Sequence, residues 1–175
     1  MTAVTAALAA FAVAATPPTG FVPREHPVSR WIAQDGEAFA VGLEVGVRVH
    51  DVIADAVEGG WDPVVAGVLA ATTTATGRTR GSDAETVTIA LGIALTQAGG
   101  FAALGDTPLG DFSRRRAAEN GRRAVLLAEA GVTAPRTGLE GRRGLAALLA
   151  PSVDPAAAIE DLGRIWRSAR QEVVR

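Results

Sequence analysis

The stretch from Glu37 to Glu58 places its polar residues at helical spacing in a sequence that is otherwise almost wholly apolar. The polar residues follow one another at intervals of four, three, four and three positions: Glu44, Arg48, Asp51, Asp55 and Glu58. Because residues three and four positions apart share one helix face, the pattern predicts a helix with a narrow polar stripe and buried surroundings. A helix enclosed in this way belongs at the centre of an all-α domain.

Start signals for further helices recur along the chain. Three capping residues stand directly before a proline: Asp62–Pro63, Thr107–Pro108 and Asp154–Pro155. Two segments have the spacing of a capping box: Ser82 to Glu85 and Thr137 to Glu140. With Gly77 as one of the stops, we expect helices over 3–15, 37–58, 63–76, 83–98, 108–130, 138–149 and 155–171. No alternation of β-branched and aromatic residues persists, so we expect no sheet.

The composition limits both the size of the fold and its chemistry. With 175 residues, 48% of them apolar, we predict one helical domain over 1–175, in which 17–36 form a proline-rich connector after the first helix. All 17 basic residues are Arg, and Lys, Cys and Tyr are absent, which excludes Schiff-base, thiolate and disulfide chemistry. The chain has only two histidines, His26 and His50, and no cysteine, so a zinc site built from these residue types is not expected, and we predict no metal and no cofactor.

The apolar N-terminus, residues 2–15, is compatible with a signal peptide or with a buried first helix. No basic residue precedes the apolar run, and Pro17 and Pro18 end it, so the buried helix is favoured. No apolar stretch reaches the ~18 to 20 residues that span a bilayer. We therefore expect a cytoplasmic protein without membrane contact.

Four segments carry motifs of a known family in a fixed order: Gly42 to Val49, Gly60 to Pro63, Leu91 to Ala98 with Arg116 to Gly121, and Pro135 to Arg142 with Leu162 to Trp166. They resemble the helical domain of the MmgE/PrpD family, the group of 2-methylcitrate dehydratase and cis-aconitate decarboxylase. Residues 42–44 and 60–62 are similar to its Gly-Tyr-Glu and Gly-Trp-His motifs. The resemblance implies a compact multi-helix bundle. We expect the family's separate α/β lid domain to be absent, because the sequence stops shortly after the last motif.

The resemblance also implies what chemistry to look for. Family enzymes remove water or carbon dioxide from small di- and tricarboxylates, or epimerise them, by proton abstraction beside a carboxylate. In this chain Asp62 stands at the histidine of Gly-Trp-His, and Gly110 and Ser113 stand where the family has a lysine and a histidine. The resemblance therefore implies that the usual acid and base residues are missing.

The remaining candidates form two groups. Possible proton carriers are Asp62, Asp111 and His50. Possible residues for binding an anionic substrate are Arg114, Arg115, Arg116, Asn120, Trp61 and Ser113. Because guanidinium groups bind carboxylates bidentately, the crowded arginines of 114–123 could hold a carboxylate or an acidic partner.

Each candidate also has a structural interpretation. Asp62 beside a proline is typical of a helix cap, His50 of a buried hydrogen-bonded histidine and Trp61 of a core residue. The arginines could form a solvated face with pairs such as Arg115 with Glu119. With a net charge of -2 and few aromatic residues, the chain is not expected to bind nucleic acid.

Two functions follow from these observations. The first is an accessory or non-catalytic subunit that forms a homodimer or docks on a full-length relative. The alternative is a divergent lyase, isomerase or cyclase whose arginine cluster holds a carboxylated small molecule. The sequence leaves open whether the protein is an enzyme.

Overall fold

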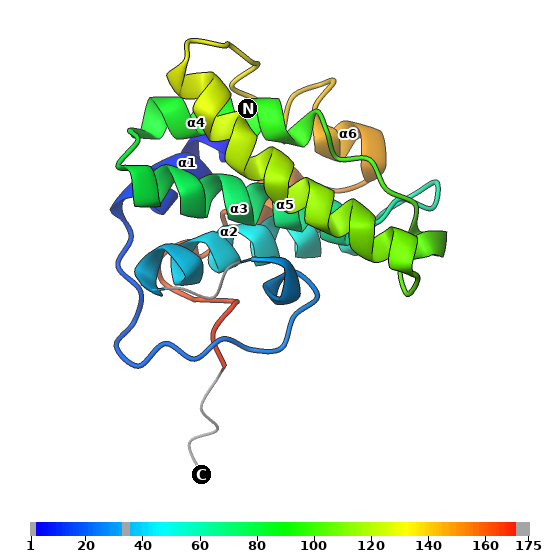
Figure 1. Cartoon of the computed structure of the whole chain (residues 1–175), viewed down its shortest axis with the longest axis horizontal. Coiled ribbons are helices and arrows are strands. Elements are labelled where there is room, and N and C mark those ends of the chain that lie inside the picture. Colours follow the sequence, from blue (N-terminus) through cyan, green and yellow to red (C-terminus); the bar gives the residue numbers. More distant parts are fainter. Residues whose placement is uncertain (1–2, 33–35, 171–175) are drawn as a thin grey trace.

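The computed structural model describes residues 3–32 and 36–170, and within them it contains six α-helices and no strand (Figure 1). The α-helices are α1 (Val4–Ala14), α2 (Gly36–Ala54), α3 (Pro63–Arg80), α4 (Ala84–Leu95), α5 (Pro108–Glu129) and α6 (Leu145–Leu149). Short 3₁₀ helices are η1 (Ser29–Trp31), η2 (Ala102–Leu104) and η3 (Pro155–Ala158). The predicted all-α fold is confirmed. No helix in the described residues is both long and apolar enough to cross a membrane.

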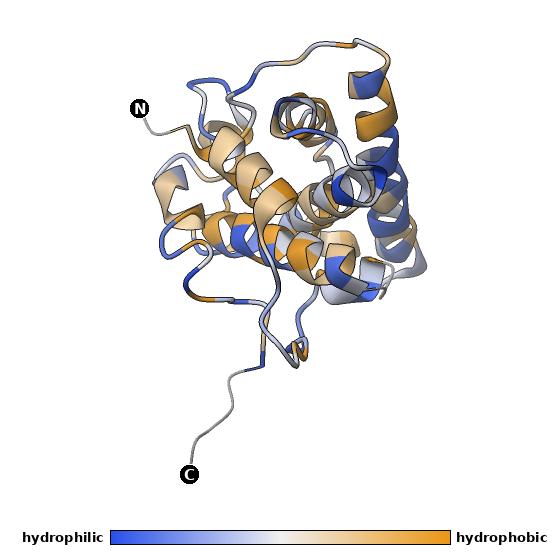
Figure 2. Ribbon diagram, turned by 90° about the vertical axis from the view of Figure 1, so that its left-hand side faces the viewer, coloured by the Kyte–Doolittle hydropathy of each residue, from blue (hydrophilic) through white to orange (hydrophobic). Residues whose placement is uncertain are grey.

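The helices α2 and α3 form the middle of the molecule. Helix α3 packs mainly against α2 and α5, and α4 lies against α1, α3 and α5 (Figure 1). Opposite faces of α2 enter two different apolar clusters, one through Val41, Val45 and Val49 and the other through Phe39, Leu43 and Val47. The central position expected for this segment is therefore what the structure shows. Helix α5 lies at the edge, and polar residues prevail along it (Figure 2).

Glycines allow the backbones of α2 and α3 to approach closely. A Cβ atom on Gly46 would lie 2.6 Å from the carbonyl oxygen of Gly67, and one on Gly67 would lie 2.9 Å from the carbonyl oxygen of Gly46. Only glycine fits at such a crossing without moving one of the helices.

The prediction of one polar stripe along α2 is partly wrong, because two of its residues, Glu44 and Arg48, are completely buried. Arg48 Nε donates to Glu44 Oε1 at 2.5 Å. The two carboxylate oxygens of Glu44 also accept from the backbone N–H groups of Arg167 at 3.0 Å and Ser168 at 2.8 Å. The pair therefore lies inside the protein, where its remaining hydrogen-bonding groups bind the C-terminal segment.

The helix expected over 155–171 is wrong beyond its first turn, and residue 171 lies outside the described residues. Only η3 forms, and turns follow it. The guanidinium of Arg48 donates to the carbonyl oxygens of Glu160 at 2.7 Å and Ile165 at 2.6 Å. Asp161 and Gly163 both have positive φ angles, 58° and 82°. Two backbone carbonyls of this segment therefore accept hydrogen bonds from Arg48 and not from the N–H groups of a helix.

The helix expected over 138–149 is also wrong in its first half, because α6 begins at Leu145. The supposed capping partner Glu140 is buried and accepts hydrogen bonds from the backbone N–H and hydroxyl of Thr5. Its carboxylate is directed at Thr5, and it forms no capping box with Thr137. The segment 134–144 forms a compact loop.

Other helix ends show which capping signals in the sequence were enough to predict where a helix begins or ends. Side chains of Asp62, Thr107 and Asp154 cap α3, α5 and η3 as expected. Helix α3 passes through Gly77 and ends at Gly81, whose φ of 71° permits the left-handed cap. In the capping box proposed over Ser82 to Glu85, Asp83 caps α4 in place of Ser82.

The connector pairs with the C-terminal segment. Arg24 N–H donates to the Ser168 carbonyl and Arg170 N–H donates to the Val22 carbonyl, both at 2.8 Å. Residues 33–35, at the end of the expected connector, lie outside the described residues. Helix α1 before it is buried through Val4 and Leu8, as a first core helix would be.

Candidate functional site

Asp62 is held by two sets of hydrogen bonds at the start of α3. Its Oδ1 accepts from the Val64 N–H at 3.0 Å, and its Oδ2 accepts from Arg114 Nε at 3.0 Å. The Asp62 side chain is only 6% exposed, and Arg114 also donates to the Gly105 carbonyl at 2.7 Å. Both carboxylate oxygens are therefore engaged in binding α3 and α5 together.

Two positions at which the family resemblance places histidines come together at Gly100. A Cβ atom added there would lie 3.5 Å from the hydroxyl of Ser113 and 3.6 Å from Cβ of Asp62. Neither a serine hydroxyl nor a carboxylate paired with Arg114 offers the imidazole ring nitrogens of a histidine. In this chain these two positions hold a hydroxyl and a carboxylate that links α3 to α5 through Arg114.

The other proposed proton carriers are not joined to this place. His50 hydrogen-bonds to Asp51, and no hydrogen bond among the described residues links it to Asp62 or Asp111. Asp111 and Asn120 are half-buried on α5, and within residues 3–32 and 36–170 their side chains make no hydrogen bond. The structure therefore assembles Asp62, Ser113 and Arg114, but not the whole predicted set.

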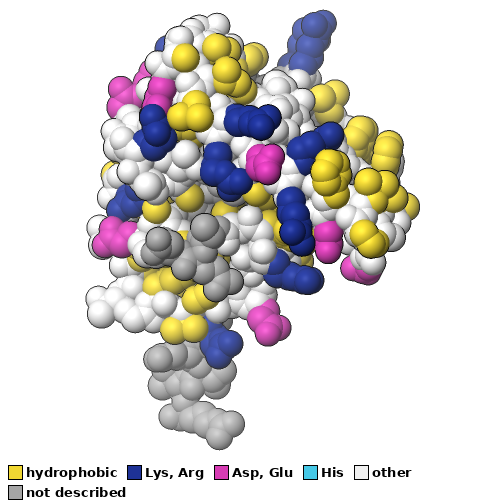
Figure 3. Space-filling model, viewed as in Figure 1, with side chains coloured by type: hydrophobic (Ala, Val, Ile, Leu, Met, Phe, Trp, Pro, Cys, Tyr) yellow, Lys and Arg dark blue, Asp and Glu magenta, His cyan; other side chains and the backbone are white. Residues whose placement is uncertain are grey.

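Two arginines of α5 lie beside Trp31. The guanidinium carbons of Arg114 and Arg115 lie 5.9 and 6.0 Å from the Trp31 ring centre, and that of Arg30 lies 5.9 Å away. The pair suggested between Arg115 and Glu119 is not among the ion pairs of the described residues. Figure 3 shows basic side chains following α5 with few acidic ones between them. This face has the charge needed to attract an anion.

A cluster of two histidines and an aspartate ties the connector to α2. Asp51 Oδ1 lies 3.1 Å from His26 Nε2 and 2.9 Å from His50 Nδ1, and Arg24 donates to Oδ2 at 3.2 Å. Burial raises the pKa of Asp51, but the hydrogen bonds and charge of both histidines outweigh it and hold that pKa well below its ordinary value. The sequence pattern missed this cluster because His26 and His50 meet only through the tertiary fold.

Three potential ligand atoms of this cluster lie within 4.8 Å of one another, as in a metal site. The Val28 N–H donates to His26 Nδ1 at 3.2 Å, so a neutral His26 ring carries its proton on Nε2, the atom that faces Asp51. A metal at Nε2 would have to displace that proton and break the Val28 hydrogen bond. The geometry therefore fits a hydrogen-bonded cluster that joins the connector to α2 better than it fits a metal centre.

We expect Asp51→Asn to reduce the free energy of unfolding by about 1 to 2 kcal/mol near neutral pH, because a neutral amide is a weaker acceptor for three donors. A depressed folded-state pKa contributes stability above the ordinary value of 3.8, and that contribution is lost as the pH falls below it. The wild type should therefore lose more stability on acidification than the variant. Urea unfolding at several pH values measures both effects.

The exposed Asp55, directly after the end of α2, supplies the control. Asp55→Asn should unfold like the wild type at each pH. Equal unfolding midpoints for Asp51→Asn and Asp55→Asn would show that the cluster does not stabilise the fold.

An apolar surface beside Asp62 is the other prominent feature of this region. The α5 apolar face consists of Trp61, Phe101, Leu109 and Phe112. Phe101, Leu109 and Phe112 are 61%, 56% and 57% exposed, and the ring of Trp61 stacks on that of Phe101 with centres 6.0 Å apart. These residues surround a hollow of about 290 Å³. The gathered hydrophobic side chains stand out in the space-filling view, where they lie beside the α5 arginines (Figure 3).

This helical bundle matches a known protein family. The model of the MmgE/PrpD N-terminal domain matches residues 5–158, which include the helices from α1, apart from its first residue, to η3 and every candidate site residue. No curated protein matches the chain.

Proposed function

Since the chain belongs to the MmgE/PrpD family, we propose that it acts as a non-catalytic member that works by association through the α5 apolar face. The exposure of Phe101, Leu109 and Phe112 carries this proposal. Large apolar side chains clustered on a surface favour contact with another protein, and aromatic residues are enriched where such contacts are made.

The engagement of Asp62 supports the non-catalytic part of the proposal. A general base has to reach its substrate, whereas the Asp62 side chain is only 6% exposed and accepts hydrogen bonds from Val64 and Arg114. The family resemblance places a histidine here, and the carboxylate in its place has a supporting role. On this proposal the family's acid and base residues have been lost while the bundle has been kept.

A second copy of this chain is the partner that the rim of the face favours. Arg116 lines the hollow of the face, and Asp111 directly precedes Phe112 on α5. In a twofold dimer the same patch meets itself, so a rim with both signs of charge can place an acid opposite a base. A larger relative with a similar surface is the other partner that this face could accept.

We expect the wild type to form a dimer with a dissociation constant on the order of micromolar, and Phe112→Asp to stay monomeric. A buried aspartate facing an apolar surface would have to lose its hydration without gaining a partner. Sedimentation velocity over a range of protein concentrations measures the association.

Leu126→Asp is the matched control, because Leu126 is 48% exposed toward the other end of the same helix. It should dimerise like the wild type. A wild type that stays monomeric at about 100 µM, a concentration well above a micromolar dissociation constant, would refute self-association. Equal loss in both variants would show that the α5 apolar face is not the interface.

The second candidate function is a lyase, isomerase or cyclase acting on a carboxylated small molecule. It is favoured by Arg115 and Arg116, which have no carboxylate within 4.0 Å among the described residues and could hold an anion. Asp111 or His50 would then carry the proton, because Asp62 is already engaged. A strictly monomeric protein would favour this candidate over the accessory role.

A further inference from the structure

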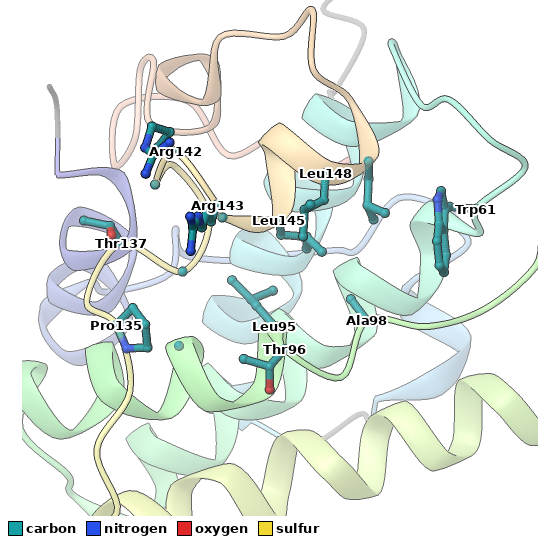
Figure 4. Close-up of a pocket in the computed structure, with 15 residues that line it drawn as sticks. Trp61, Leu95, Thr96, Ala98, Pro135, Thr137, Arg142, Arg143, Leu145 and Leu148 are labelled. Atoms are coloured by element: carbon teal, nitrogen blue, oxygen red, sulfur yellow. The ribbon is translucent and has the colours of Figure 1, made fainter.

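A second, larger cavity lies between α4, the loop 134–144 and α6 (Figure 4). Its volume is about 670 Å³, within the range of pockets that hold small molecules. Among the described residues, Trp61 alone lines both this cavity and the hollow of the α5 apolar face. The Asp62–Arg114 pair and the arginines beside Trp31 do not line the cavity, so it is separate from both of those groups.

The two ends of this cavity differ in chemistry. Arg142, Arg143 and Thr137 extend from the loop at one end, and Trp61 stands at the opposite end (Figure 4). Between them the wall is formed by leucines of α4 and α6: Leu95, Leu145, Leu148 and Leu149. A ligand that fills the space would place an anionic group at the loop and an apolar body along the leucines.

The charge at the loop end is not neutralised within the described residues. No acidic residue lines the cavity, and neither Arg142 nor Arg143 has a carboxylate within 4.0 Å in that part of the chain. Nearby Arg136, in contrast, pairs with Glu85 at 2.5 Å. Glu140, the acidic residue of the loop, is buried against Thr5 instead. Two adjacent guanidinium groups without an internal partner suit a carboxylate from outside.

The loop that carries these arginines is fixed by its own contacts. The Leu145 N–H donates to the Gly138 carbonyl at 2.8 Å, and the Gly144 N–H donates to the Gly141 carbonyl at 2.7 Å. A Cβ atom on Gly138 would lie 3.0 Å from Cα of Gly92 in α4, so the loop rests directly on that helix. A fixed loop binds a ligand without first paying the entropy of ordering its backbone.

We propose that this cavity binds a small amphipathic carboxylate, with the carboxylate held by Arg142 and Arg143 and the apolar body lying against Leu145 and Leu148 toward Trp61. This site goes beyond the association proposed above and does not depend on it. A straight-chain fatty acid of medium length has the required shape and charge.

Isothermal titration calorimetry with decanoate, decanol and succinate tests the site. Decanoate should bind, whereas decanol lacks the charge and succinate lacks the apolar body, so both should bind at least about tenfold more weakly. Replacing both arginines, as Arg142→Gln with Arg143→Gln, should weaken decanoate binding by about tenfold or more.

Arg122→Gln with Arg123→Gln is the control, because it removes the same charge from exposed positions on α5. It should bind decanoate like the wild type. Equal weakening by both double variants would show that only the net charge attracts the ligand, and no decanoate binding to the wild type would overturn the site. Sedimentation of the Arg142/Arg143 double variant should match the wild type, so failure of this site can be told apart from failure of the α5 apolar face.

Discussion

Arg48→Met should destabilise the protein by about 3 to 5 kcal/mol, because it leaves the buried carboxylate of Glu44 without its counter-charge. The same change removes the donors to the carbonyl oxygens of Glu160 and Ile165. We therefore expect the segment after η3 to separate from α2 before the helices unfold. Urea unfolding followed by circular dichroism measures the first effect, and limited proteolysis after residue 158 measures the second.

Two further variants separate the buried charge from lost packing. Glu44→Gln combined with Arg48→Met should be less damaging than Arg48→Met alone, since no unpaired charge then remains buried. Arg80→Met breaks an exposed pair with Glu129 and should cost less than about 1 kcal/mol. If Arg48→Met and Arg80→Met unfolded at the same urea concentration, the buried pair would not have the role assigned to it.

Gly46→Ala should lower stability by about 2 to 3 kcal/mol through overpacking at the crossing of α2 and α3. The new methyl group would lie 2.6 Å from both the Gly67 carbonyl oxygen and Cβ of Ala71, so the helices must move apart. Alanine is favoured over glycine in a helix by about 1 kcal/mol, and the clash has to exceed that gain. Thermal unfolding followed by circular dichroism reports the net change.

Gly99→Ala is the control for this substitution, because a Cβ atom there meets nothing within 4 Å. Its free energy of unfolding should stay within about 0.5 kcal/mol of that of the wild type. A Gly46→Ala protein as stable as the wild type would mean that the two helices do not approach as closely as the structure shows.

The sequence predicted those parts of the fold that depend on neighbouring residues. Caps at Asp62 and Thr107 act within one helical turn, so their positions in the sequence located the starts of α3 and α5. The helices predicted over 138–149 and 155–171 were wrong because the conformation of these segments depends on contacts with distant residues. Glu140 binds Thr5 and Arg48 binds Glu160, and neither partner can be inferred from local spacing.

The residues of the candidate site also divide into features that the sequence predicted and features that depend on the folded chain. The cap at Asp62 was visible as an alternative in the sequence, but its second partner Arg114 was not, because α5 reaches it only in the folded chain. For the cluster of His26, His50 and Asp51, the sequence suggested a hydrogen-bonded His50 but neither of its neighbours in the cluster. The exposure of Phe101 and Phe112 was equally hidden, since exposed and core aromatic residues look alike in sequence.

Hydrogen–deuterium exchange at low and high protein concentration tests most directly whether this family member works by association. The account predicts that amides in 99–113, which include most of the α5 apolar face, exchange severalfold more slowly at high concentration. Amides in 120–129, on the same helix but beyond the face, should exchange at an unchanged rate. Exchange in 99–113 that is independent of concentration, in a protein that also fails to protect any other segment, would contradict the account.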